Sequence, residues 1–362
     1  MQATQPTRPT RMWPLWLTTT ALVLVAGLAH AEPAAPDWPR FNHQVVQQHL
    51  LPRYARLDSS AATLAKATDT LCQAPSAQTL ATTQDAWRDA MQAWQGIQHV
   101  QFGPVQFLMR NFGLQFWPDR KNIGARQLRQ ALMSEQPYDD EFFRHASVSI
   151  QGLPALERLL FADDALDKLQ SGRSCELSRA IAGHVADMSQ AIHQEWQTQA
   201  AADFAADQDS EQAAEWAVEL LASLVEPIEA IRDSKILAPL GENAESARAL
   251  RLESHRSRQS LDNIRTNLAA LTALYQETQP SLAQLLQQAG AAELADDISR
   301  RFEKINRQLA QVPAPLAETL TQPKTHAQLL QVAAELKQLS EQLNTAMGVL
   351  NIQLGFNSRD GD

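Results

Sequence analysis

Apolar side chains recur at steps of three and four residues along nearly the whole chain, which is the spacing of one face of an α-helix. The longest such series occupies residues 329–354, and a second one occupies residues 220–228. Trp87, Met91 and Trp94 share one helical face in the same way. No segment alternates between apolar and polar residues over a length that would predict a strand. The pattern therefore predicts an all-α protein made of helical bundles.

Glycine, proline and capping residues predict where these helices begin and end. We expect Pro52 to kink the first helix, and the turn-rich residues 163–174 to divide the chain into two halves. The predicted helices occupy residues 41–71, 76–101, 105–112, 125–133, 139–146, 153–161, 176–205, 211–236, 244–277, 281–288, 292–310, 315–320 and 326–354.

Residues 1–31 have the three parts of a secretory signal peptide. Arg8 and Arg11 precede an apolar run over residues 15–28, and a small-x-small sequence follows at residues 29–31. We predict cleavage directly after this segment, which places the mature chain in the periplasm. The alternative is an uncleaved membrane anchor, but a span needs about 20 apolar residues and this run is shorter. No cysteine at the cleavage site supports a lipid anchor, and no later segment is apolar enough to span a bilayer.

The chain carries 41 acidic and 31 basic residues, which gives a formal net charge of -10. The predicted signal peptide contains two arginines and no acidic residue, so the mature chain is more acidic still. An acidic surface repels phosphate groups. The charge therefore argues against nucleic acid or an anionic membrane surface as a partner.

The only two cysteines, Cys72 and Cys175, each lie beside a predicted helix boundary. Because an exported protein folds in an oxidising compartment, we expect them to form a disulfide bond. Closing a loop of about 100 residues stabilises a fold by roughly 4–5 kcal/mol in the chain-entropy model. Two free thiols are the alternative, and no histidine or further cysteine stands at the spacing of a metal site.

The segment 148–161 combines a helix start with a single acidic residue. Gly152 and Pro154 mark the start, since proline is tolerated in the first turn of a helix. Glu157 follows one turn later, close to the positive end of the helix dipole. It is either a charge that stabilises its own helix by roughly 0.3–1 kcal/mol, or an acceptor in a cavity with an arginine or a bound ion as its partner.

This segment resembles the Gly-x-His-x-x-Glu motif of the imelysin-like family of bacterial envelope proteins, with Pro154 at the position of the histidine. A histidine and a glutamate three residues apart share a helix face and hold a metal ion together, whereas proline has no lone pair to donate. The Gly-Leu-Pro-Ala-Leu-Glu form resembles a recurring branch of the family. Further resemblance covers nearly the whole mature chain and lies in residues 49–54, 86–94, 101–104, 116–122 and 253–257.

The resemblance implies two up-and-down helical bundles packed side by side. We place them at residues 37–168 and 169–356, which together form one unit. The family also implies a ligand site between the bundles, where carboxylates accept from a cation or its chelate and arginines bind carboxylate groups. The candidate ligand-binding residues are Gly152, Glu157, Arg120, Trp117, Asp119, Glu253, Ser254 and Arg256, and the candidate metal ligands are Glu157 and His49.

Each candidate also has a structural interpretation. Glu253, Arg256 and Ser257 share a face of one predicted helix, which is also the arrangement of an ordinary surface ion pair. The loop that carries Trp117 is either a rigid edge of a pocket or a turn with the indole buried. His49 is either a ligand or a histidine of the core.

Three functions remain open. The resemblance implies a periplasmic binding protein for the uptake of iron or another metal, which binds a small ligand, a metal ion or a metal chelate and works with iron-uptake proteins of the envelope. The second function is a metallopeptidase, the activity that named the family. A catalytic metal needs about three protein ligands, so the missing histidine disfavours it, and we assign no catalytic residue. The third is an envelope scaffold without a small ligand. An ion of iron or another divalent metal is the only cofactor that the resemblance suggests, and the chain has no His-Glu-x-x-His motif, phosphate loop or dinucleotide fingerprint.

Overall fold

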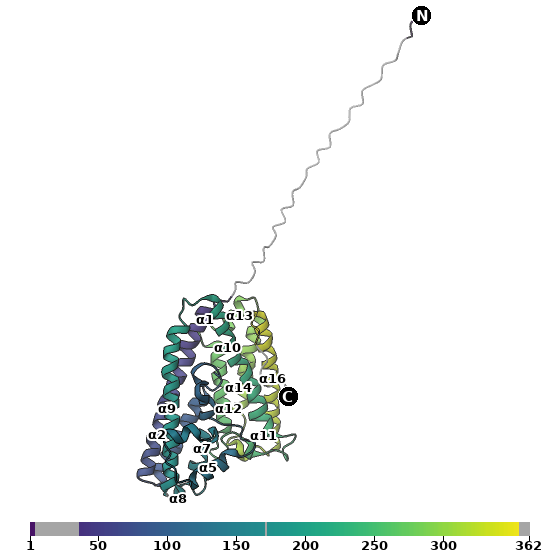
Figure 1. Cartoon of the computed structure of the whole chain (residues 1–362). Coiled ribbons are helices and arrows are strands. Elements are labelled where there is room, and N and C mark those ends of the chain that lie inside the picture. The colour runs from purple at the N-terminus through teal and green to yellow at the C-terminus, as the bar shows by residue number, and fades with distance from the viewer. Residues whose placement is uncertain (4–35, 171, 355–362) are drawn as a thin grey trace. The chain divides into compact units, whose positions relative to one another are not determined.

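The computed structural model describes residues 1–3, 36–170 and 172–354, and every regular element in them is a helix (Figure 1). This confirms the predicted all-α class. The predicted signal peptide lies outside the described residues, apart from its first three. None of the described helices is long and apolar enough to cross a membrane.

The first half of the fold begins with a long antiparallel pair. Helix α1 (Trp38–Val45) continues through a π-helical segment, Val46–Leu50, into α2 (Leu51–Gln73), and α3 (Ala77–Gln95) returns beside α2. Pro52 is the second residue of α2, so the irregularity expected at this proline takes the form of the wide π-helical turn just before it. The other helices of this half are α4 (Arg110–Leu114), α5 (Ile123–Met133), α6 (Asp140–His145), α7 (Leu153–Leu160), α8 (Ala165–Leu169) and α9 (Gly172–Asp203).

Aromatic rings and one covalent bond hold this half together. Tyr54 of α2 stacks on Trp196 of α9 with ring centroids 5.8 Å apart. The indole nitrogen of Trp87 in α3 donates a hydrogen bond of 2.9 Å to the carbonyl of Leu153 at the start of α7. The predicted disulfide between Cys72 and Cys175 is present and joins the end of α2 to the first turn of α9.

The second half is a bundle of α10, α12, α14 and α16 with shorter connecting helices. Its apolar stripe over residues 329–350 is buried as the spacing predicts. The helices of this half are α10 (Ser210–Ala230), which runs into the π-helical segment Ile231–Leu237, then α11 (Ala238–Leu240), α12 (Ser260–Gln276), α13 (Leu282–Gln288), α14 (Ala292–Ala310), α15 (Leu316–Thr319) and α16 (Pro323–Val349).

The packing bears on where the two halves divide. Helix α9, which the predicted division assigns to the second bundle, lies along α2 and α7 of the first half. The second bundle instead meets the first where α10 packs on α1 and α12 packs on α3. The division into two bundles stays a prediction, but this packing favours a boundary after residue 203 rather than after residue 168.

Two predicted helices are wrong in a way that matters for the site. Residues 105–112 do not form one helix, because Leu108 and Met109 adopt left-handed backbone angles, with φ of 54° and 58°. The helix predicted over residues 244–277 begins only at α12. Before it, residues 253–258 form turns in which Ser254 and Arg258 have φ of 50° and 65°. These turns place polar side chains against the other half, which one face of a regular helix would not allow.

Candidate functional site

Two loops and the first turns of α7 enclose a cavity of about 610 Å³, which we call the arginine cavity. One loop, residues 115–122, joins α4 to α5, and the other, residues 252–258, precedes α12. Seven of the eight candidate ligand-binding residues line it: Trp117, Asp119, Arg120, Glu157, Glu253, Ser254 and Arg256. The sequence pattern thus brings together residues from three separate segments. That they bind a ligand stays a prediction.

The eighth candidate, Gly152, does not line the cavity but sets the position of its wall. It precedes α7 and is buried. A Cβ atom built on Gly152 would overlap the carbonyl oxygens of Gly113 and Leu114 at the end of α4. Only glycine therefore lets α7 approach this backbone, which fixes where Glu157 lies.

Glu157 reaches across to the loop before α12 instead of capping its own helix. Its side chain is 4 % exposed. Its Oε1 atom accepts two hydrogen bonds of 2.9 Å from Ser257, one from the backbone N–H and one from the hydroxyl. Burial raises the pKa of Glu157, although the bonds from Ser257 and the positive charges of Arg256 and Arg158 act in the opposite direction. The partner found for its Oε1 is therefore Ser257, which neither interpretation of Glu157 named.

Asp119 shapes the loop before α5. Its Oδ1 accepts from the backbone N–H of Ile123 at 2.7 Å, and its Oδ2 accepts from that of Gly124 at 2.8 Å. Arg158 lies 3.5 Å from the same carboxylate. Asp119 thus caps α5 and orients Arg158. The carboxylate of Asp119 therefore already has partners within the protein.

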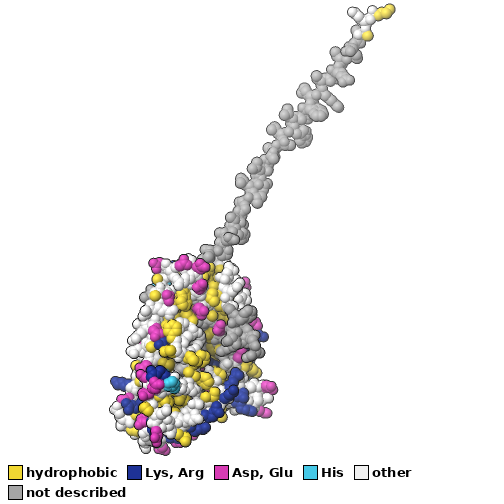
Figure 2. Space-filling model, in the orientation of Figure 1, with side chains coloured by type: hydrophobic (Ala, Val, Ile, Leu, Met, Phe, Trp, Pro, Cys, Tyr) yellow, Lys and Arg dark blue, Asp and Glu magenta, His cyan; other side chains and the backbone are white. Residues whose placement is uncertain are grey.

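Four arginines line the arginine cavity: Arg120, Arg158, Arg251 and Arg256. Of these, only Arg158 forms an ion pair with a described residue. The space-filling view shows Lys and Arg side chains gathered at the end of the helical unit that holds α5, α7 and α11 (Figures 1 and 2). His255 also lines the cavity, and burial and the positive charge of Arg256 lower its pKa to about 4. The charge in the cavity that no ion pair neutralises is that of the other three arginines, and it is positive.

Glu253 forms the floor of the cavity and belongs to a buried polar network. Its Oε2 accepts from Lys235 Nζ at 2.9 Å and from Asn263 Nδ2 at 2.8 Å, and its Oε1 accepts from Gln115 Nε2 at 2.9 Å. Lys235 also donates to the side-chain oxygen of Asn267 at 2.7 Å. Burial lowers the pKa of Lys235, while the carboxylate of Glu253 raises it. This network ties the loop after α4 to the second bundle.

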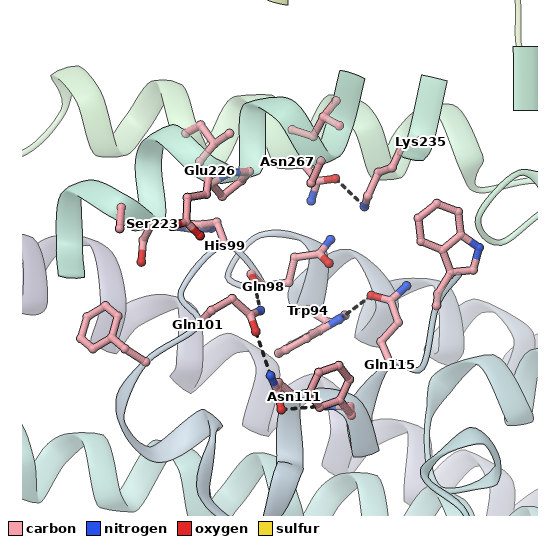
Figure 3. A pocket seen from close by; sticks show the side chains of 18 of the residues that line it. Trp94, Gln98, His99, Gln101, Asn111, Gln115, Ser223, Glu226, Lys235 and Asn267 are labelled. Atoms are coloured by element: carbon pink, nitrogen blue, oxygen red, sulfur yellow. Dashed lines mark hydrogen bonds between the residues drawn. The ribbon is translucent and has the colours of Figure 1, made fainter. Parts of the chain in front are cut away.

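A second cavity of about 550 Å³ lies on the other side of this floor (Figure 3). We call it the amide cavity, because six glutamine and asparagine side chains line it. The two cavities share Gln115, Trp117 and Glu253 as a common wall. Trp117 lies in the wall between the two cavities and is half-buried. Its indole is therefore not fully buried in a turn, and it lines both cavities.

The two candidate metal ligands do not meet. His49 is buried in the π-helical segment, where its Nε2 lies 2.8 Å from Nε2 of His99. Burial lowers the pKa of both rings, that of His99 to about 3, so the pair is neutral near pH 7. Glu157 and His49 line no common cavity. Among the described residues, no group of three or more His, Cys, Asp and Glu side chains is placed to hold a metal ion.

Several neighbours of the candidate residues were not predicted. Glu253, Arg256 and Ser257 lie in turns instead of on the predicted helix face, and of these three only Ser257 donates a hydrogen bond to Glu157. Arg158, which directly follows Glu157, was not among the candidates. Lys235 carried a usable signal, since it is a lone cation in the apolar segment that ends α10.

Comparison with known proteins gives a consistent result. The family model described as imelysin matches residues 50–345. Iron-regulated protein A of Synechococcus elongatus is 26 % identical over 312 residues, which are 82 % of this chain and 82 % of that protein. An imelysin-like protein from Psychrobacter arcticum has the same fold, with a TM-score of 0.75 and 22 % identity over 89 % of this chain and 98 % of that chain. A putative iron-regulated protein A precursor from Parabacteroides distasonis has a TM-score of 0.71 and 16 % identity, over 88 % and 97 % of the two chains.

Proposed function

The chain belongs to the imelysin family, and from that premise we propose that it is a periplasmic binding protein that serves iron uptake. Its ligand is a ferric chelate that carries carboxylate groups, bound in the arginine cavity. The observation that carries this proposal is the set of arginines around Glu157, contributed by separate segments of the chain.

The charges of the arginine cavity favour an anionic ligand over a bare cation. Asp119 and Glu253 are each held by two or more hydrogen bonds, so neither is available to a metal ion. Arg120 and Arg256 have no such partner among the described residues. A guanidinium group binds a carboxylate through two parallel hydrogen bonds, which supplies both affinity and orientation. A cavity of about 610 Å³ is also in the usual range for a small ligand.

Iron as the cargo is supported by the relatives and not by the geometry alone. The Synechococcus protein is named for its regulation by iron, and so is the Parabacteroides protein. The latter is also named a precursor, which agrees with the signal peptide predicted for this chain. A periplasmic protein of this kind would pass its ligand to iron-uptake proteins of the envelope.

Within this function each lining group has a distinct role. Arg120 and Arg256 bind the outer carboxylates of the chelate. Glu157 is held by Ser257 through Oε1, and no described residue donates to its Oε2. That oxygen is therefore available to a hydroxyl group of the ligand. Trp117 supplies an apolar surface against which the ligand packs.

The experiment is a calorimetric titration of the purified mature protein with ferric citrate, with citrate alone as the comparison. We expect binding of the chelate that weakens about tenfold in Arg256→Gln, which corresponds to the loss of one charge-assisted contact. Arg307→Gln is the matched control, because Arg307 is an exposed arginine on α14 away from both cavities. Equal affinity in wild type and Arg256→Gln, or no binding by the wild type, would overturn the proposal.

A further inference from the structure

Among the described residues, His255 is the histidine that lines the arginine cavity, and the proposed function gives it no role. It lies in the turns of residues 252–258 and is partly buried. The arginines of the same lining can only donate hydrogen bonds, because a guanidinium group has no acceptor. An imidazole nitrogen with a free lone pair therefore adds a different chemistry to the cavity.

A backbone contact fixes the orientation and the tautomer of this ring. Nδ1 of His255 lies 3.2 Å from the carbonyl oxygen of Leu252. Since a carbonyl oxygen can only accept, Nδ1 carries the proton and donates it. The ring is neutral near pH 7, because burial and the positive charge of Arg256 lower its pKa to about 4. A neutral imidazole has one proton, so Nε2 of His255 has a lone pair.

This lone pair has no partner within the described residues. No hydrogen bond or ion pair joins Nε2 of His255 to another described group, and the atom is not fully buried. A histidine that binds a metal usually donates its other N–H to a backbone carbonyl or a carboxylate, which holds the ring in place. His255 has that arrangement through Leu252, with Nε2 left for a ligand.

Other histidines lack one part of this arrangement. His43 is held in the same way by the carbonyl oxygen of Phe204, but it lines neither cavity. His99 lines the amide cavity (Figure 3), but its Nε2 lies 2.8 Å from Nε2 of His49. His255 combines a fixed ring, an unpaired nitrogen and a place in a cavity.

The surroundings of His255 suit a metal that arrives with its own ligands. Arg158 and Arg256 act on the pKa of both His255 and Glu157, so these four side chains lie near one another in the cavity. Among the described residues, no three His, Cys, Asp or Glu side chains are placed to hold a bare ion. An iron ion in a chelate already has most of its ligands, and one imidazole is enough to complete them.

We propose that Nε2 of His255 coordinates the iron of the ferric chelate in the arginine cavity, in the position of a water molecule of the free chelate. The inference rests on the proposed function, because the arginines bring the chelate to this place. The bond between iron and water breaks, and a bond between iron and Nε2 forms. The iron stays ferric, and no proton leaves the ring because Nε2 is unprotonated. Imidazole nitrogen is a common ligand of iron in proteins.

The ligand class follows from this contact. Only a ferric chelate with at least one position occupied by water can accept the imidazole of His255. A chelator that fills every position on the iron leaves none, so its complex would meet the arginines alone. The arginines thus select for negative charge, and His255 selects for an incompletely filled iron.

The test is pulsed electron paramagnetic resonance of the purified mature protein loaded with ferric citrate, with and without ¹⁵N-labelled histidine. We expect a coupling between the iron and a histidine nitrogen that changes with the isotope and is absent in His255→Gln. His145→Gln is the matched control, because His145 is exposed and lines neither cavity. In calorimetric titrations, His255→Gln should weaken ferric citrate binding by at least about tenfold, since even the loss of a group that orients a metal ligand costs that much. His145→Gln should stay within twofold of the wild type.

The outcomes separate this inference from the proposed function. Ferric citrate that binds to the wild type without a histidine coupling, or a coupling that persists in His255→Gln, would overturn the role of His255 and leave the proposed function standing. No binding by the wild type would overturn both. Arg256→Gln should weaken binding but keep the coupling in the protein that remains loaded. The isotope comparison uses the wild-type chain, so it does not depend on how well His255→Gln folds.

Discussion

A single carboxylate oxygen, Oε1 of Glu157, accepts both the backbone N–H and the hydroxyl of Ser257, each at 2.9 Å, although 100 residues separate the two in the chain. These two hydrogen bonds join α7 of the first half to the loop that precedes α12 in the second half. Because Glu157 is nearly excluded from solvent, its hydrogen bonds are stronger than those of an exposed carboxylate. The contact therefore defines one wall of the arginine cavity.

Removal of the Ser257 hydroxyl should destabilise the protein measurably. In Ser257→Ala, Oε1 of Glu157 keeps the backbone bond but loses the bond from the side chain. We expect the free energy of unfolding to fall by about 1–2 kcal/mol, the usual cost of one lost bond to a buried charged group. Chemical denaturation with urea measures this. An unchanged unfolding midpoint would contradict the role assigned to this contact.

The raised pKa of Glu157 predicts a specific pH dependence. Because the folded state holds the proton more tightly than the unfolded chain, this residue's contribution is present below its unfolded pKa and is lost as the pH rises through the folded pKa. Glu157→Gln has no such loss. The stability of this variant relative to wild type should thus increase from about pH 4.5 towards neutral pH.

Removal of one charge of the Lys235–Glu253 pair should lower the free energy of unfolding strongly. Both side chains are buried and lie 2.9 Å apart. Glu253→Gln leaves the ammonium group of Lys235 buried without a counter-ion, and we expect a loss of about 3–5 kcal/mol in unfolding free energy. The double variant Lys235→Met with Glu253→Gln removes both charges and should recover much of that loss. Equal destabilisation in the single and double variants would show that the pair does not act as a unit.

The His49–His99 pair predicts the opposite pH trend from Glu157. Burial lowers both pKa values, so the folded state resists protonation and loses stability as the pH falls from about 6.5 towards the folded pKa, which is about 3 for His99. Urea denaturation at several pH values should show a shallower decline in the double variant His49→Gln with His99→Gln.

The close approach at Gly152 makes it sensitive to the smallest substitution. In Gly152→Ala the added methyl group meets the backbone oxygens of Gly113 and Leu114, which cannot rotate away. We expect a loss of about 1–3 kcal/mol in stability together with weaker ferric citrate binding, because α7 and Glu157 must shift. Gly183→Ala is the control, since a Cβ atom there has no neighbour within 4 Å. A fully stable Gly152→Ala protein would contradict this packing argument.

The sequence predicts the helices well where apolar spacing alone decides them. The stripe of α16 is buried, and the disulfide between Cys72 and Cys175 is formed. The loops are harder to predict, because left-handed residues such as Leu108 and Ser254 leave no periodic signal in the sequence. The helix predicted over residues 244–277 fails for this reason: its first part is held in turns by bonds to Lys235 and Glu157.

In the candidate site, too, the sequence predicts some features and not others. Residues in short motifs, such as Trp117, Glu157 and Arg256, line one cavity, and their binding of a ligand stays a prediction. Their partners could not be predicted, because hydrogen bonds between segments as far apart as Glu157 and Ser257, 100 residues, have no local pattern. The pairing of His49 with His99, and not with Glu157, left no local pattern either, although these two histidines are only 50 residues apart. The amide cavity is a further case, since its lining is contributed by α3, α10 and α12 together.

The most direct test of the central claim is a crystal structure of the mature protein grown with ferric citrate, with data collected at the iron absorption edge. We expect an anomalous peak inside the arginine cavity, with citrate carboxylates on Arg120 and Arg256 and a hydroxyl group on Glu157. An empty arginine cavity with iron bound elsewhere, or iron held directly by His49, would contradict the proposed binding site.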